Sequence, residues 1–472
     1  MNGCGGDVAA ILHAALESVD PERLILRRLA VLHGALSVDG RPLAVMPREG
    51  RLVVVGAGKA AAGLARGLAR VIVTSGGGRA DGLLSVPAGS GEGVVRAGDG
   101  RIEVRATRPA AVNLPTPAAV EATAAMRSLL AGLGPADVAV ALVTGGGSAC
   151  LVAPRPGLPL DEKIAVTGFL SRAGADIREL NVVRQAASDV KGGGLARACR
   201  AGRLVVIVLS DIVGDPLDLI ASAPCLPVPP RAAEALAILE RYGAIAAGVG
   251  PTLARMLERD RSDALASAPP VSPADAWTNA HGCRVEHVLL GSNTTAVEAA
   301  AARARTLGYD VVARVADADG VESADAVGRR LAREGRALVA AACRDGRPRA
   351  VVEGGEAVVC VPADHGRGGR NQQTVVAALA DMRGGDPWPA GLVVASIGSD
   401  GEDGPTTAAG GCVDAQVAAR ALGLDVDRAL DRCDAHPLLD AIGGLLVTGP
   451  TGTNVADLRV VLVRPGPSDA PG

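Results

Sequence analysis

The chain contains three lysines, although lysine and arginine together number 48. Two of the three, Lys59 and Lys191, adjoin glycine clusters in the segments Gly56-Ala-Gly-Lys59 and Lys191-Gly-Gly-Gly194. The compact ammonium group of lysine is not interchangeable with a guanidinium where a tight pocket holds an anion. We therefore predict that Lys59 and Lys191 neutralise charge on a phosphate group or on a second substrate. The alternative is that both are ordinary lysines at helix starts.

Two glycine-rich turns each follow an apolar run that predicts a buried strand. Residues 52–55 precede Gly56 and Gly58, and residues 138–143 precede Gly145, Gly146, Gly147 and Ser148. Backbone N–H groups can approach an anion closely at glycine because no Cβ blocks them. These residues are therefore candidates for binding phosphate oxygens. The alternatives are a dinucleotide loop at the first turn and close packing of the backbone at the second.

Two pairs of acids, Asp211 with Asp215 and Asp400 with Asp403, also follow apolar runs. Carboxylates suit Mg²⁺ and can also accept the proton of a reacting hydroxyl. We predict that Asp211 and Asp215 hold Mg²⁺ and that Asp400 is the base, with Asp211 and Asp400 open to exchange of these roles. Helix capping by the first pair and turn formation by the second are the alternatives.

A second group of polar residues lies in glycine-rich segments of the C-terminal part. Arg370 and Asn371 follow Gly368 and Gly369, and Asn454 lies in the segment 448–457. A guanidinium among glycines suits bidentate capture of a phosphate or carboxylate. We predict that Arg370 stabilises charge on a transferring group and that Asn371 and Asn454 bind a cofactor; a surface arginine and turn-capping side chains are the alternatives.

The elements that must position these residues are apolar strands alternating with helical segments. This alternation predicts an α/β protein with a doubly wound, mostly parallel sheet, in which ligands lie at the carboxyl ends of the strands. The best linker candidate is the segment Ser267-Ala-Pro-Pro-Val-Ser-Pro273. We predict an N-terminal Rossmann-like domain at 1–265, a linker at 266–284 and a smaller C-terminal α/β domain at 285–472, with the active site in the cleft between the domains.

Composition excludes several classes of function. Aromatic residues make up 1% of the chain and the formal net charge is −3, so neither stacking platforms nor a basic surface indicates nucleic-acid binding. No uncharged apolar run is long enough to predict a membrane span, and the first residues lack the pattern of a secretory signal. The nine scattered cysteines are typical of reduced thiols in a cytoplasmic protein. A homodimer is one alternative for the oligomeric state.

Motifs over nearly the whole chain resemble the glycerate 2-kinase family with a C-terminal MOFRL domain, whose members are often named hydroxypyruvate reductase. The segments that carry the resemblance stand in the family's order: Gly56-Ala-Gly-Lys59, Thr144-Gly-Gly-Gly-Ser-Ala149, Gly174-Ala-Asp-Ile-Arg-Glu-Leu-Asn181, Lys191-Gly-Gly-Gly-Leu-Ala196, Leu209-Ser-Asp-Ile-Val-Gly-Asp215, Gly368-Gly-Arg-Asn371, Ser399-Asp-Gly-Glu-Asp-Gly-Pro-Thr406 and Thr448-Gly-Pro-Thr-Gly-Thr-Asn-Val-Ala-Asp-Leu458. The resemblance implies phosphorylation of the 2-hydroxyl of D-glycerate with ATP and Mg²⁺.

Two departures from the family pattern concern the acceptor. The chain has Gln185 and Ala186 where the family usually has Lys-His, and Leu114 and Ala118 where it usually has His and Asp. These losses remove groups that a glycerate carboxylate could use. A different hydroxyl acceptor, such as a sugar or an aminocyclitol, is therefore an alternative to D-glycerate.

Two further alternatives keep the fold but not the kinase reaction. One is an NAD(P)-dependent hydroxypyruvate reductase; against it, position 61 is Ala, so Gly56-Ala-Gly58 does not complete the Gly-x-Gly-x-x-Gly pattern of dinucleotide loops. The other is a regulator that binds sugar phosphates without turnover.

Overall fold

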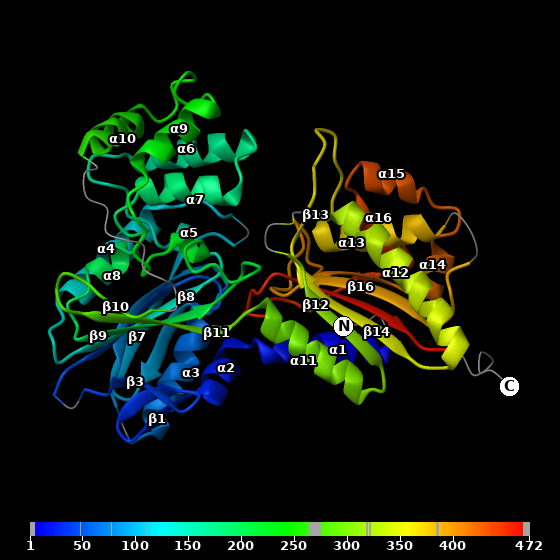
Figure 1. Ribbon diagram of the computed structural model, residues 1–472, viewed down its shortest axis with the longest axis horizontal. Helices are drawn as coiled ribbons and strands as arrows, with labels where there is room; N and C mark the ends of the chain where they lie inside the picture. The colour runs from blue at the N-terminus through cyan, green and yellow to red at the C-terminus, as the bar shows by residue number, and fades with distance from the viewer. Residues whose placement is uncertain are drawn as a thin grey trace. The chain divides into compact units, whose positions relative to one another are not determined.

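The structure is a computed structural model, and it describes residues 5–47, 49–76, 78–110, 112–263, 275–317, 320, 322–383 and 387–465. The chain forms two compact units that interleave in sequence (Figure 1). We call Pro21–Leu209 with Asp215–Leu290 the N-terminal unit. The C-terminal unit combines Met1–Asp20, Ser210–Gly214 and Gly291–Gly472.

The N-terminal unit is built on an eight-stranded sheet of order β10-β11-β9-β8-β4-β5-β7-β6. Its central strands β9, β8, β4, β5 and β7 pair in parallel, and β6 and β10 add antiparallel edges. The sheet confirms the predicted mostly parallel arrangement. Its strands are β4 (Leu52–Ala57), β5 (Asp81–Pro87), β6 (Gly93–Ala97), β7 (Gly100–Arg108), β8 (Val138–Thr144), β9 (Arg203–Leu209), β10 (Trp277–Thr278) and β11 (Arg284–Gly291).

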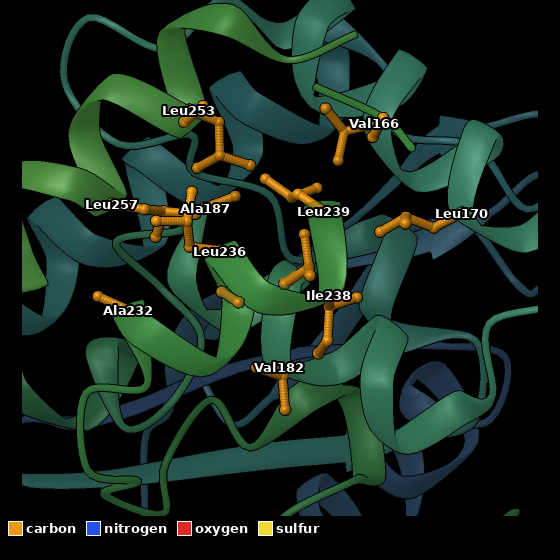
Figure 2. Close-up of a cluster of buried hydrophobic side chains, with 14 of the residues drawn as sticks. Val166, Leu170, Val182, Ala187, Ala232, Leu236, Ile238, Leu239, Leu253 and Leu257 are labelled. Atoms are coloured by element: carbon orange, nitrogen blue, oxygen red, sulfur yellow. The ribbon is translucent and has the colours of Figure 1, made fainter. Parts of the chain in front are cut away.

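Some helices of this unit directly follow strands of the sheet, and four others pack together around a core of their own. Helices α6, α7, α9 and α10 share one apolar core, in which Leu170, Val182, Leu239 and Leu257 are buried (Figure 2). This core fixes the positions of α6 and α7, which carry polar residues discussed below. The helices are α2 (Pro21–Arg28), α3 (Ala61–Thr74), α4 (Pro117–Ala131), α5 (Gly147–Cys150), α6 (Leu160–Arg172), α7 (Ile177–Ala186), α8 (Gly194–Arg197), the 3₁₀ helix η1 (Ile220–Ser222), α9 (Ala232–Arg241) and α10 (Pro251–Asp263).

The C-terminal unit is built on a mixed six-stranded sheet of order β12-β14-β19-β16-β17-β18, in which β12 and β14 are parallel and the other pairs are antiparallel. Helices α1 and α11 pack together and against β19, while α12 and α13 pack together and against β16 (Figure 1). The elements are α1 (Gly6–Ser18), α11 (Asn293–Thr306), β12 (Asp310–Val315), β13 (Glu322–Ser323), α12 (Ala324–Asp345), β14 (Arg349–Gly355), β15 (Ala357–Val358), α13 (Arg370–Met382), β16 (Leu392–Gly398), β17 (Gly410–Val413), α14 (Ala415–Arg420), α15 (Val426–Asp431), α16 (Ala435–Ile442), β18 (Leu445–Leu446) and β19 (Asp457–Val463).

The compact units differ from a division by chain order. Residues 1–20, which the prediction placed in the N-terminal domain, group with the C-terminal unit because α1 buries its apolar face against α11 and β19. The predicted linker 266–284 lies partly outside the described residues; its later part contains β10, and the following β11 belongs to the sheet of the N-terminal unit.

Three further findings correct or extend the prediction. The segment 7–35 is not entirely helical, because after α2 it enters a three-stranded antiparallel sheet of β1 (Leu29–Leu32), β2 (Ala35–Val38) and β3 (Arg41–Val45). Cys412 is disulfide-bonded, so the prediction that the cysteines are reduced thiols is wrong for Cys412. Within the described residues, no helix combines the length and the apolarity that crossing a membrane requires.

Candidate active site

The first glycine turn connects β4 to α3, but its N–H groups are already used. The N–H of Gly58 donates to the Ser85 carbonyl (3.2 Å), that of Lys59 to the Gly145 carbonyl (2.9 Å), and that of Ala60 to Thr144 Oγ1 (3.2 Å). Gly58 has φ +113°, and a Cβ added there would lie 2.3 Å from Thr144 Oγ1. Gly56 and Gly58 therefore serve close packing between β4 and β8, a role that the sequence had suggested only for the second glycine turn.

The second glycine turn, between β8 and α5, remains open. Gly146 has φ +74°, and the backbone N–H groups of Gly146, Gly147 and Ser148 form no hydrogen bond to another described residue. A Cβ added at Gly146 would lie 3.1 Å from Arg108 Nη2 and 3.6 Å from Lys59 Cγ. Two cationic side chains thus approach the open turn, which is the arrangement that an anion requires.

Arg108 at the end of β7 is buried, and sequence reasoning missed it. Its Nη1 donates to the carbonyls of Pro109 (3.3 Å) and Val112 (2.7 Å), while its Nε has no hydrogen-bond partner. No described carboxylate forms an ion pair with it. A buried guanidinium without a counter-ion is costly, so its position beside Gly146 favours a role in binding anions. The strand β7 was itself not predicted, so no sequence signal placed Arg108 at a strand end.

Lys191 is buried against the same turn. Its Nζ donates to Ser148 O (2.9 Å), Ser148 Oγ (3.0 Å) and Ala221 O (3.3 Å). Burial lowers the pKa of Lys191 well below its usual value, and the charges of Lys163 and Arg184 lower it further. The structure therefore brings Lys191 and Ser148 together, and it links both to the turn at Gly146.

In the C-terminal unit, Arg370 begins α13 and is held by two carboxylates. Its Nε lies 2.8 Å from Asp457 Oδ2, its Nη2 lies 3.0 Å from Asp457 Oδ1, and its Nη1 lies 2.7 Å from Glu356 Oε1. Asp457 is fully buried at the start of β19. Burial acts to lower the pKa of Arg370, but Asp457 and Glu356 raise it overall, so the guanidinium is a fixed positive charge.

Asn371 and Asp403 form the buried support of this arginine. Asp403 Oδ1 accepts the N–H of Asn371 (3.0 Å), and Oδ2 accepts the N–H of Gln372 (2.8 Å). Asn371 Nδ2 donates to Asp457 Oδ1 (3.0 Å), and its Oδ1 accepts Ser396 Oγ (2.6 Å). Burial raises the pKa of Asp403. These bonds give Asp403 a structural role at the first turn of α13 and show the Asn371 side chain to be engaged in the protein.

Glu356 is one of the two acids that pair with Arg370. Its side chain is 47% exposed, yet the surrounding protein atoms still raise its pKa by partial removal from solvent, whereas Arg370 opposes the shift; the charges of Asp457, Asp211 and Asp400 raise it further. Asp400 Oδ1 accepts the N–H of Glu402 (3.1 Å) in the turn that follows β16. The charges of Asp211 and Asp400 therefore act on the carboxyl that pairs with Arg370, and these residues belong to the same unit. Sequence reasoning did not single out Glu356.

The remaining predicted residues have local contacts. Asn454 Oδ1 accepts the N–H of Ala456 (3.3 Å), a bond that caps its own loop. Asp215 has φ +55° in the turn after β9 and falls in the N-terminal unit, while Asp211 falls in the C-terminal unit. Among the described residues, no three His, Cys, Asp or Glu side chains form a group that could hold a metal ion.

Comparisons with known proteins cover both units. Residues 7–258 match the family described as "Domain of unknown function (DUF4147)", and residues 349–457 match the MOFRL family. A glycerate kinase of Homo sapiens is 35% identical over 492 residues, which cover 92% of this chain and 90% of that protein. The chain belongs to the glycerate kinase family. A glycerate 2-kinase of Pyrococcus horikoshii is 30% identical and is covered over 95% of both chains.

The fold is shared with solved structures of this family. The crystal structure of a glycerate kinase from Thermotoga maritima superposes with a TM-score of 0.76 at 30% identity, covering 97% of this chain and 98% of that one. One relative in the glycerate kinase family, from Agrobacterium vitis, carries the name of a hydroxypyruvate reductase at 33% identity over 96% of this chain and 93% of that protein. Names within the family thus include both activities that the sequence left open.

Proposed function

We propose that this member of the glycerate kinase family transfers the terminal phosphoryl group of ATP to the 2-hydroxyl of D-glycerate, forming 2-phosphoglycerate. The observation that carries the proposal is the open turn at Gly146–Ser148, which Lys59 and Arg108 approach and Lys191 adjoins. Phosphoryl transfer depends mainly on positioning and on neutralising charge, and these groups supply both. The glycerate kinases of similar length support the choice of substrate.

The proposal also assigns roles to Arg370 and Asp400. Arg370, fixed by Asp457 and Glu356, neutralises charge on the transferring group. Asp400 takes the proton of the acceptor hydroxyl, and Asp211 is the alternative base. Asn371 acts on the nucleotide indirectly, since its side chain holds Asp457 and Asp403. Asn454 keeps its predicted cofactor role as part of the proposal.

Mg²⁺ fits the donor set, because carboxylate oxygens are the ligands it prefers and it needs one or two of them beside phosphate and water. Removal from solvent is the main cause of the raised pKa of Glu356, and the charges of Asp457, Asp211 and Asp400 add to it. Repulsion of this second kind is relieved by a divalent cation. Asp211 and Asp215 would hold the ion. When bound, Mg²⁺ would neutralise charge on the nucleotide phosphates.

The reductase alternative is less well supported by the geometry. A dinucleotide needs free N–H groups and close backbone approach at the first glycine turn. In this chain the N–H groups of Gly58, Lys59 and Ala60 are bonded within the protein. The kinase proposal uses the second turn instead.

A coupled assay separates these activities. Purified protein is incubated with ATP, Mg²⁺ and D-glycerate, and ADP release is compared with that of samples without acceptor. The kinase proposal predicts release that depends on D-glycerate, and no oxidation of NADH or NADPH with hydroxypyruvate. Nicotinamide oxidation without glycerate-dependent ADP release would instead identify a reductase. If ATP binds but no acceptor is phosphorylated, the regulator alternative is favoured.

A further inference from the structure

A small cavity of about 40 Å³ lies beside the second glycine turn in the N-terminal unit. Its walls come from α6, α7, the start of α5 and the loop before α4. The lining residues include three cations and no acid: Lys163, Arg184 and Lys191, with Ser148, Leu114 and Ile164 among the others.

The three cations have few partners that could balance their charge. Lys163 is 4% exposed, and its Nζ contacts the Arg184 carbonyl at 3.5 Å. The Arg184 guanidinium forms no hydrogen bond or ion pair with a described residue. Lys191 donates to Ser148 and Ala221, whose oxygens carry no formal charge. Three basic side chains thus face one cavity without a described carboxylate among them.

Such a cluster is unfavourable in the absence of an anion. Burial, together with the charge of Arg184, lowers the pKa of Lys163 to about 8. Burial also lowers the pKa of Arg184. Removing cations from water costs free energy that only a counter-charge recovers. Since the apolar core of Figure 2 holds α6 and α7 in place, this cost is built into the fold, as is expected where a ligand supplies the missing charge.

We propose that this cavity binds the carboxylate of the phosphoryl acceptor, an inference that rests on the proposed function. The phosphate turn has further cations in Lys59 and Arg108, and of the three basic residues of the cavity only Lys191 also adjoins that turn. Lys163 and Arg184 are therefore left for a second anion. The cavity is small, and Leu114 and Ile164 give it an apolar side suited to a short carbon chain. Ser148 belongs to both the turn and the cavity, which places the carboxylate next to the phosphate-binding backbone.

The proposal makes the acceptor a small hydroxy acid and not a neutral sugar or aminocyclitol. It also leaves Gln185 and Ala186 outside the proposed carboxylate site. These two residues line a different cavity of about 540 Å³, where Gln185 Nε2 donates to the Asp218 carbonyl (3.1 Å). Leu114 is the one position among the noted departures that lines the small cavity.

Lys163→Met and Arg184→Gln test the cavity, and Arg172→Gln is the matched control because Arg172 is an exposed cation on the same helix as Lys163. Steady-state kinetics with D-glycerate and ATP should show the KM for D-glycerate raised at least about tenfold in both cavity variants, since a charge-assisted contact is lost. The KM for ATP should stay within about twofold, and the control should match the wild type. Without ligand, Lys163→Met should unfold at the same temperature as the wild type or higher.

Calorimetric titration of D-glycerate into each protein keeps the test separate from turnover. Binding by the wild type that is lost in Lys163→Met supports the cavity even if no phosphate is transferred. Glycerate phosphorylation with an unchanged KM in both variants would overturn the cavity while leaving the kinase proposal intact. A raised KM for ATP alone would assign the cavity to nucleotide phosphate and overturn the carboxylate. Absence of both binding and turnover in the wild type would also overturn it.

Discussion

Lys59 is the residue whose removal should affect the reaction most directly. Lys59→Ala removes a cation beside Gly146 but keeps the backbone N–H that donates to the Gly145 carbonyl. Loss of one electrostatic contact to a transition state costs about 100- to 1,000-fold in turnover. We expect kcat with D-glycerate to fall by that factor while the unfolding temperature stays unchanged. A variant that retains activity within about threefold of the wild type would remove Lys59 from the mechanism.

Glu353 should determine part of the acid stability of the C-terminal unit. It is 2% exposed on β14, and burial alone would raise its pKa. Hydrogen bonds and charges from Arg330, Arg459 and Arg314 instead lower the pKa from 4.5 to about 2. The folded state therefore favours the ionised form.

The sign of this linkage gives a testable pH dependence. The stability contributed by Glu353 is complete above pH 4.5, and it is lost as the pH falls toward about 2. The amount is on the order of 3 kcal/mol. Urea unfolding monitored between pH 6 and pH 2 should show a shallower decline for Glu353→Gln than for the wild type, starting from a lower stability. Parallel curves for the two proteins would mean that the arginines do not stabilise the carboxylate.

At the scale of elements, the junction of β4 and β8 depends on Gly58. A Cβ at this position would lie 2.3 Å from Thr144 Oγ1 and 2.5 Å from the Thr144 carbonyl, with φ at +113°. Gly76 is a matched control because its φ is +111° and a Cβ there meets nothing within 4 Å. We expect Gly58→Ala to cost about 3 kcal/mol or more in unfolding free energy, and Gly76→Ala about 1 kcal/mol, since only the first adds a clash to the backbone strain. Equal losses in chemical denaturation would contradict the close packing.

The sequence predicted strands correctly where each strand is one continuous apolar run. Apolar runs located β4, β8 and β9 because buried parallel strands are continuous and apolar. The antiparallel pairs among β1–β3 and β6–β7 were missed. Strands β1, β2 and β6 are short and partly exposed, and β7 is longer but alternates buried and exposed residues, so it lacks a continuous apolar run. Residues that these strands position, above all Arg108, were therefore not foreseen.

The sequence predicted which residues belong to the candidate site better than it predicted their contacts. Lys59, Lys191, Ser148 and Arg370 lie in polar clusters within their own units. The sequence could not reveal that the N–H groups of the first glycine turn are used by neighbouring strands, because those partners are distant in the chain. Nor could it reveal that Asp403 faces the first turn of α13.

At the scale of the whole molecule, the first helix belongs to the C-terminal unit. Ile11 on α1 is fully buried, and α1 packs against α11 and β19. Ile11→Ala should cost about 3 kcal/mol through the cavity it leaves. Hydrogen exchange should then accelerate in β19 and not in β8, whereas Ile72→Ala on α3 should do the reverse. Faster exchange in β8 for Ile11→Ala would contradict the interleaved organisation.

The central claim is that the chain phosphorylates D-glycerate at its 2-hydroxyl, and phosphorus NMR of the reaction product tests it most directly. The protein is incubated with ATP, Mg²⁺ and D-glycerate until ADP accumulates, and the new phosphate ester is assigned from its coupling to the carbon-bound protons. The account predicts 2-phosphoglycerate. An ester at the 3-position, or no ester despite bound ATP and D-glycerate, would contradict it.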